Sequence, residues 1–211
     1  MDSLVNSIFR VITKNRNLIV KLFEISYLIL VVLLYFGYRA IVSGQGSFDL
    51  YYSLGKKMAE ASVIVFILTV IPGMARRFGI SHKLIAILMI FRRYLGILTF
   101  MLVLLHSSFV WFLPSLSSGG FLVPGSGFEL WGFIAFVLLL LLFVTSNDLS
   151  VRLLGEWWTR IHSLSYAIMW VVLIHVMLQG RYAWSFLIGI TSVAEISSFI
   201  VARARRRTSM R

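Results

Sequence analysis

Six long runs of apolar residues, separated by shorter polar stretches, dominate the pattern along this chain. A helix that crosses the hydrocarbon core of a bilayer needs about 20 mostly apolar residues. Runs of roughly that length cover residues 18–40, 58–74, 84–112, 130–145, 158–178 and 183–202. The pattern therefore predicts an all-α integral membrane protein, a bundle of six transmembrane helices that occupies residues 18–202.

The distribution of Lys and Arg gives this predicted bundle an orientation. Loops rich in these residues stay in the cytoplasm, and sixteen of the twenty fall on the side that holds both termini. We therefore expect residues 1–17 to be a cytoplasmic N-terminal segment and residues 203–211 a basic cytoplasmic tail. The basic start resembles a signal peptide, but no small-residue cleavage site follows, so we expect a retained first span.

Composition supports a membrane protein and excludes several classes of site. Hydrophobic residues make up 59% of the chain and charged residues 13%, where a soluble domain carries about 25% charge. A net charge of +12 would point to nucleic acid in a soluble protein. Here the basic residues flank apolar runs, so we expect the lipid bilayer as their partner and no nucleic acid. The absence of cysteine excludes disulfides and iron–sulfur clusters.

Glycine and proline gather between residues 113 and 127, the longest irregular connection that the pattern predicts. This connection faces outward on the expected topology. It is either a contact site for an external partner or a flexible link between two helices.

Three of the four histidines lie inside predicted spans, His106 in the third and His162 and His175 in the fifth. An ionisable side chain in hydrocarbon usually faces the bundle interior and has a function, the alternative being a neutral core histidine. The third and fifth spans run in the same direction. At about 1.5 Å per residue, His106 and His175 differ by only about 5 Å in depth. Two imidazoles at one level can fill both axial positions of a haem iron.

His162 lies near the inner end of the fifth span, about 20 Å from His175 along an ideal helix. The matching level of the third span carries Arg92 and Arg93 instead of a histidine. An arginine pair beside a single histidine can hold an anionic cofactor, through haem propionates or a flavin phosphate. The alternative is that the arginines anchor the chain at the inner lipid surface.

Three segments of the chain together resemble the ferric-reductase-like transmembrane superfamily. They are RRYLGILTFMLVLLHSSF, LLFVTSND and GEWWTRIHSLSYAIMWVVLIHV. Within it, the haem-binding membrane subunit of the bacterial protein-methionine-sulfoxide reductase system is most similar. The likeness covers about residues 84–176. The residues that carry it are Arg92, Arg93, Leu95, Gly96, His106, Thr145, Ser146, Gly155, Trp158, His162, Tyr166 and His175.

The resemblance implies a bundle in the bacterial inner membrane that carries b-type haem. His106 and His175 would be the axial ligands of an outer haem b. His162, with Trp158 and the Arg92–Arg93 pair, would serve an inner site that holds a second haem or a flavin, FMN or FAD. Larger relatives place two histidines on each of the two spans, and the arginine pair departs from that arrangement.

The same resemblance implies partners. Larger relatives carry a cytoplasmic flavin and nicotinamide dehydrogenase domain, and this sequence has no glycine-rich dinucleotide fingerprint. We therefore expect a separate cytoplasmic flavin reductase as electron donor, and a periplasmic or extracellular redox partner, such as a methionine-sulfoxide reductase, as acceptor. Two other classes stay open: a transporter or proton relay that uses buried histidines, arginines and Glu195 without haem, and a structural subunit without cofactor.

Overall fold

The computed structural model describes residues 2–44, 48–120 and 122–208, and this part of the chain is almost entirely helical, with no β-strand. The all-α prediction is therefore confirmed. In chain order the elements are α1 (Asp2–Lys14), α2 (Arg16–Val42), α3 (Phe48–Phe78), α4 (Lys83–Ser107), the π-helical turn η1 (Ser108–Phe112), α5 (Leu113–Ser117), α6 (Gly127–Val144), α7 (Asp148–Leu154), α8 (Glu156–Leu178) and α9 (Tyr182–Thr208).

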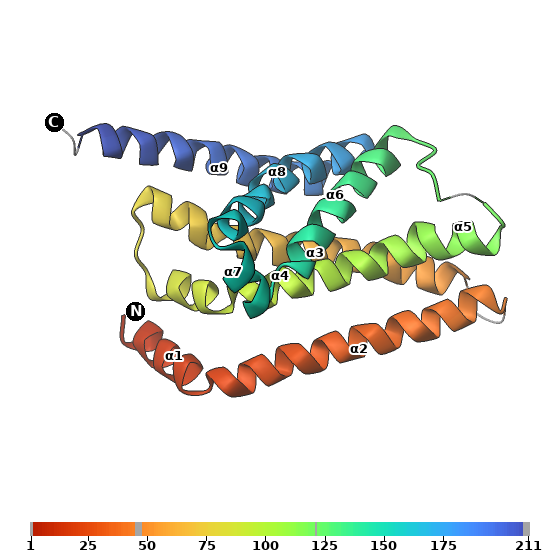
Figure 1. Cartoon of the computed structure of the whole chain (residues 1–211), viewed down its shortest axis with the longest axis horizontal. Helices are drawn as coiled ribbons and strands as arrows, with labels where there is room; N and C mark the ends of the chain where they lie inside the picture. The colour runs from red at the N-terminus through yellow and green to blue at the C-terminus, as the bar shows by residue number, and fades with distance from the viewer. Residues whose placement is uncertain (1, 45–47, 121, 209–211) are drawn as a thin grey trace.

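Six of these helical segments in the described residues are long and apolar enough to cross a membrane, as the sequence predicts: α2, α3, the continuous stretch Lys83–Ser117, α6, α8 and α9. Both termini lie at one end of the bundle (Figure 1), together with the turn between α3 and α4. We call this the terminal end. The opposite end, with the connections that precede α3, α6 and α9, is the loop end.

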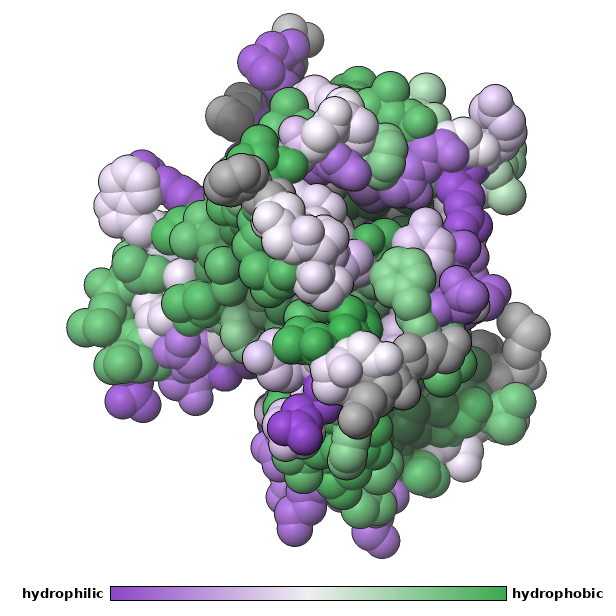
Figure 2. Space-filling model, turned by 90° about the vertical axis from the view of Figure 1, so that its right-hand side faces the viewer, coloured by the Kyte–Doolittle hydropathy of each residue, from purple (hydrophilic) through white to green (hydrophobic). Residues whose placement is uncertain are grey.

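Large apolar side chains cover much of the bundle's outer surface. On α2 the only buried residue is Gly37, while Leu28 and Ile29 are 62% and 59% exposed. Figure 2, which looks onto the loop end, shows hydrophobic and hydrophilic side chains side by side on this face. Apolar surface on this scale, on helices that satisfy their own backbone groups, is suited to contact with lipid tails. The chain is a multi-pass membrane protein.

The core of the bundle lies where α3, α4, α6, α8 and α9 meet. Phe66, Phe100 and Ile168 are among its buried side chains. By contrast, α2 lies outside this core and approaches η1 closely at Gly37, where an added Cβ would overlap Cε1 of Phe109. A small residue at a helix crossing of this kind allows the two backbones to come together.

Several segments that the hydrophobic pattern leaves outside the spans are helical. Residues 113–117, predicted as the start of the outward connection, instead continue the third span as α5, so that prediction is wrong for these residues. Pro114 lacks the N–H that would bond to the preceding turn. The helix nevertheless continues into α5, because the wider π-helical turn η1 directly before it accommodates this break in the hydrogen-bond pattern. The predicted N-terminal segment contains α1, and the tail stays helical to Thr208.

Candidate cofactor sites in the bundle

A cavity of about 600 Å³ opens near the loop end, and both His106 and His175 line it. Its walls come from the first half of α3, most of α6, the turn η1, the start of α9 and the last turns of α4 and α8. The volume falls in the range of about 300–1,000 Å³ that is usual for sites of small ligands and cofactors. We call it the histidine cavity.

His106 stands in the last turn of α4, and its ring is fixed by the backbone of α3. Nδ1 lies 3.1 Å from the carbonyl oxygen of Gly55. Because a carbonyl only accepts, Nδ1 carries the proton, and Nε2 keeps its lone pair. Among the described residues Nε2 has no hydrogen-bond partner. Gly55 also permits the close approach of α3, since an added Cβ there would lie 2.9 Å from Cγ2 of Val110.

His175, in the last turn of α8, is held in the same way by α6. Nδ1 lies 2.6 Å from the carbonyl oxygen of Phe128, so it too donates and leaves the lone pair on Nε2. The side-chain amide of Gln179 lies 3.2 Å from Nε2 and donates to it. Gly132 on α6 faces the ring, and a Cβ at that position would lie 2.7 Å from Cε1 of His175.

The donor set of the histidine cavity fits a haem iron. Iron-bound and zinc-bound histidines almost always donate their second ring nitrogen to a carbonyl or carboxylate, which fixes the tautomer and leaves the other nitrogen for the metal. His106 and His175 both have this arrangement. No cluster of three or more His, Cys, Asp or Glu side chains that could hold a bare metal ion occurs in the described residues. A porphyrin supplies the other four ligands itself.

Charged side chains stand at the mouth of the histidine cavity. Lys56, Glu60 and Arg181 all line it. Glu60 pairs with Arg181 across a 3.4 Å contact and with the neighbouring Lys57 at 3.1 Å. Glu129 lines the cavity as well, so its lining carries two cations and two carboxylates. Lys56, which forms no ion pair with a described residue, is the cation that could bind a carboxylate of a cofactor or partner.

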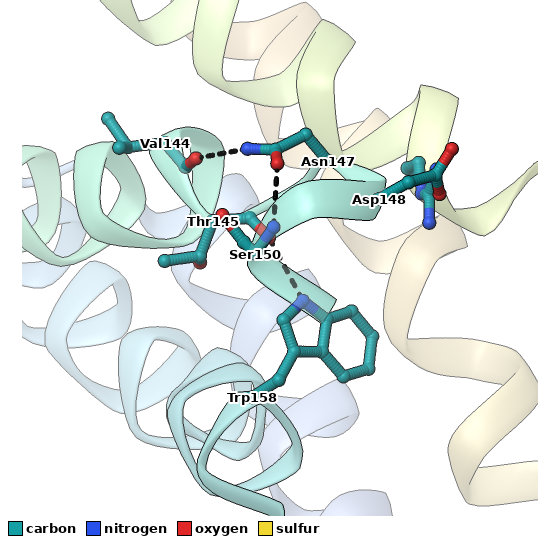
Figure 3. A network of polar contacts seen from close by, with 7 residues as sticks. Val144, Thr145, Asn147, Asp148, Ser150 and Trp158 are labelled. Carbon is teal, nitrogen blue, oxygen red and sulfur yellow. Dashed lines mark hydrogen bonds and ion pairs between the residues drawn. The ribbon is translucent and has the colours of Figure 1, made fainter. Parts of the chain in front are cut away.

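A second group of sequence-predicted residues meets toward the terminal end. His162 and Trp158 stand in the first two turns of α8, and their rings stack with centroids 4.1 Å apart. Thr145, at the end of α6, binds both. Its hydroxyl lies 3.1 Å from Nε2 of His162. Its carbonyl accepts from the Trp158 indole at 2.9 Å, and Figure 3 shows this second bond. We call these residues, with Arg92 and Arg93, the terminal-end site.

The ring of His162 has the opposite tautomer to the other two. The Thr145 hydroxyl donates its single proton to the carbonyl of Leu141 at 2.8 Å, so it accepts from Nε2 of His162. The lone pair of His162 therefore lies on Nδ1. To bind an iron through Nε2, His162 would have to release Thr145.

The two arginines of the terminal-end site differ in their contacts. Both act electrostatically on His162. Arg93 forms an ion pair of 2.7 Å with Asp148 at the start of α7. Arg92 is half-buried and makes no hydrogen bond or ion pair with another described residue. Of the pair, Arg92 is therefore the one whose guanidinium is open to an anionic group.

The turn between α6 and α7 keeps this arrangement in place. The Asn147 side chain donates to the carbonyl of Val144 at 2.7 Å and accepts from the backbone N–H of Ser150 at 2.8 Å, which closes the turn (Figure 3). Asn147 is thus the N-cap of α7 and brings Asp148 toward Arg93.

Aromatic side chains fill the space between the two sites. Phe136 lines the histidine cavity, and its ring centroid lies 5.8 Å from that of Phe100. The Phe100 ring in turn stacks on Phe143, with ring centroids 4.4 Å apart. Phe143 precedes Thr145 by two residues. The region between the histidine cavity and the terminal-end site is consequently apolar and closely packed.

Sequence reasoning missed the groups that orient the histidines. Gly55 and Phe128 contribute backbone carbonyls, which leave no side-chain signal. Gly132 did leave one, because it is a glycine inside a strongly apolar run and marks a close approach to another group. The remaining histidine, His82, lies outside both sites and caps α4 by accepting from the N–H of Leu84 at 3.3 Å.

The comparisons with known proteins agree with this architecture. No solved structure matches the chain. The sequence model of the ferric reductase-like transmembrane component matches residues 58–174, a range that runs from α3 to α8. It includes the residues of the terminal-end site and His106, and it ends one residue before His175. The match covers more than half of the 211 residues. On this evidence the chain belongs to the family of ferric reductase-like transmembrane components.

Proposed function

We propose that this protein is a b-type haem subunit that passes electrons across a bacterial inner membrane. Membership of the ferric reductase-like family gives it a role in transmembrane electron transfer. The observation that carries the haem assignment is the pair His106 and His175, which line one cavity with both Nδ1 atoms on backbone carbonyls. When bound there, haem supplies one-electron chemistry at its iron.

The residues of the histidine cavity would do three things for such a cofactor. His106 and His175 would hold the iron through Nε2, which is free in His106 and which in His175 would first have to release the side-chain amide of Gln179. The apolar walls exclude water, which together with axial ligation sets the reduction potential. Lys56, which lines the cavity and has no acidic partner among the described residues, would bind a carboxylate of the cofactor.

The terminal-end site is the entry point for electrons in this proposal. Arg92 offers a guanidinium for a phosphate or carboxylate, and Trp158 offers an aromatic face beside His162. This combination suits FMN, FAD or a second haem. Both termini lie in the cytoplasm, where the basic residues of the terminal end attract an acidic flavin reductase. The acceptor is a redox partner outside, of the methionine-sulfoxide reductase type.

The test is a visible spectrum of the protein purified in mild detergent, reduced with dithionite minus oxidised, with haem and flavin extracted and counted per chain. Wild type is expected to show the sharp bands of a low-spin b-type haem. His106→Ala and His175→Ala are each expected to lose the haem of the histidine cavity, because each variant lacks one of the two imidazoles that would hold the iron.

His82→Asn is the matched control, since asparagine preserves the N-cap of α4 and His82 lies outside both sites. Its spectrum is expected to equal that of wild type. A folded wild type that stays colourless after haem is supplied would overturn the proposal, as would full haem content in both alanine variants.

A further inference from the structure

A third polar cluster lies apart from both candidate cofactor sites, where α3, α8 and α9 pack together. Arg77, in the last turn of α3, reaches into this junction. Its Nε donates to the hydroxyl of Ser198 on α9 at 2.8 Å, and its Nη1 donates to the hydroxyl of Tyr166 on α8 at 2.7 Å. A single guanidinium therefore connects three membrane-spanning helices.

The junction is built to hold this guanidinium. It lies over the rings of Tyr166 and Phe199, with Cζ 4.4 Å and 3.9 Å from the two ring centroids. Cation–π contacts of this kind stabilise a desolvated cation. Gly73 allows the Tyr166 hydroxyl to approach α3, since a Cβ there would lie 2.5 Å from it.

Three atoms of the cluster are left without partners. Nη2 of Arg77 and both carboxyl oxygens of Glu195 are buried and make no hydrogen bond to any described residue. Glu195, on α9 one turn before Ser198, is 3% exposed, and the charge of Arg77 acts on it. No ion pair within 4 Å joins the two in the described part of the chain. Buried polar atoms in native proteins are nearly always satisfied.

Two occupants would satisfy these atoms. A water between the side chains can donate to the Glu195 carboxylate and accept from Nη2 of Arg77, as buried waters do between unpaired polar groups. A proton on Glu195 instead removes the charge whose burial is most costly. Both occupants come from the same source, the aqueous phase at the terminal end, where Arg77 lies in the last turn of α3.

We propose that Arg77 and Glu195 form a buried proton-binding site, hydrated when Glu195 is ionised and proton-loaded when it is neutral. The step is the addition of one proton from bulk water to one carboxylate oxygen, with no other bond made or broken. The proposal does not depend on haem, because neither residue belongs to the histidine cavity or the terminal-end site.

The charged and titratable groups around Glu195 are few. Arg77 faces it from α3, and Tyr166 on α8 binds the guanidinium of Arg77. His162, one turn from Tyr166 on α8, is turned toward Thr145 on α6. On α9 itself the next charged residue is Arg203, two turns farther on. The titration should therefore depend on Arg77 above all.

The experiment is infrared difference spectroscopy of the full chain in lipid nanodiscs, between about pH 5 and about pH 9. A neutral carboxylic acid has a C=O stretch that the carboxylate lacks. Subtracting the Glu195→Gln spectrum from that of wild type isolates this one group among the eight acidic residues. The expected result is a C=O band at low pH that is lost at high pH, with complete loss in Glu195→Gln.

Glu24→Gln is the matched control, because Glu24 is an exposed acid on α2, and its spectrum should keep the band. Arg77→Gln should shift the midpoint of the titration by at least about one pH unit. If Glu195→Gln does not fold, as judged by helical circular dichroism, Glu195→Asp should keep a band at a shifted frequency. A double-difference spectrum without a C=O band, or a band that does not change with pH, would overturn the proposal.

Discussion

At the scale of single residues, Gly132 has the clearest effect on a predicted ligand. The Gly132→Ala substitution puts a Cβ 2.7 Å from Cε1 of His175, so the ring must move and its bond to Phe128 must weaken. Overpacking of this kind costs about 1–3 kcal/mol. We expect that loss in the free energy of unfolding, measured by circular dichroism during titration with sodium dodecyl sulfate.

Gly96→Ala provides the control, because nothing lies within 4 Å of a Cβ at Gly96. Alanine stabilises an open helical position by up to about 1 kcal/mol relative to glycine, so this variant should be as stable as wild type or more so. Equal stability of Gly132→Ala and Gly96→Ala would contradict the close packing of α6 against His175.

The residue scale also shows where sequence reasoning stops. His106 and His175 can be placed at one depth from the lengths of two parallel spans, and the structure brings both to one cavity. The tautomers cannot be predicted in the same way. They depend on carbonyls of Gly55 and Phe128, which belong to helices far away in the sequence and have no residue-type signature.

At the scale of elements, the start of α6 is defined by a capping box. Ser126 accepts from the N–H of Glu129, and the Glu129 carboxylate accepts from the N–H of Ser126 at 3.0 Å. Ser126→Ala removes the hydrogen bond that the Ser126 hydroxyl accepts and should lower the free energy of unfolding by about 1 kcal/mol. Ser197→Ala is the comparison, since that exposed hydroxyl bonds only within α9 and its loss should stay within about 0.5 kcal/mol. Equal free energies of unfolding in the two variants would mean that the capping box does not stabilise the protein.

The six spans can be predicted because each is a long apolar run. The residues at which their helices begin and end are harder to predict. The hydrophobic run starts α3 at residue 58, whereas the helix begins at Phe48. Its first turns carry Asp49, Lys56 and Lys57, which are compatible with a helix but lower the mean hydropathy of this segment. A hydropathy pattern measures contact with lipid, so it cannot find helical turns that extend beyond the apolar layer.

At the scale of the whole molecule, the arrangement of the spans explains why one bundle can hold two sites. Both α4 and α8 run from the terminal end to the loop end. Residues early in both helices therefore meet at the terminal-end site, and residues late in both meet at the histidine cavity. Aromatic side chains of α4 and α6 fill the space between them. This topology therefore brings one group of candidate site residues toward each end of the bundle.

The orientation of the whole bundle can be tested with cysteine labelling, which is clean here because the chain has no native cysteine. Ser118→Cys lies at the loop end, and Ser7→Cys and Thr208→Cys lie at the terminal end; all three positions are exposed. The excess of Lys and Arg at the terminal end predicts that this end lies in the cytoplasm. A membrane-impermeant maleimide should therefore label Ser118→Cys in intact cells, and the other two only after permeabilisation. The reverse pattern would put the terminal-end site outside and exclude a cytoplasmic reductase as its electron donor.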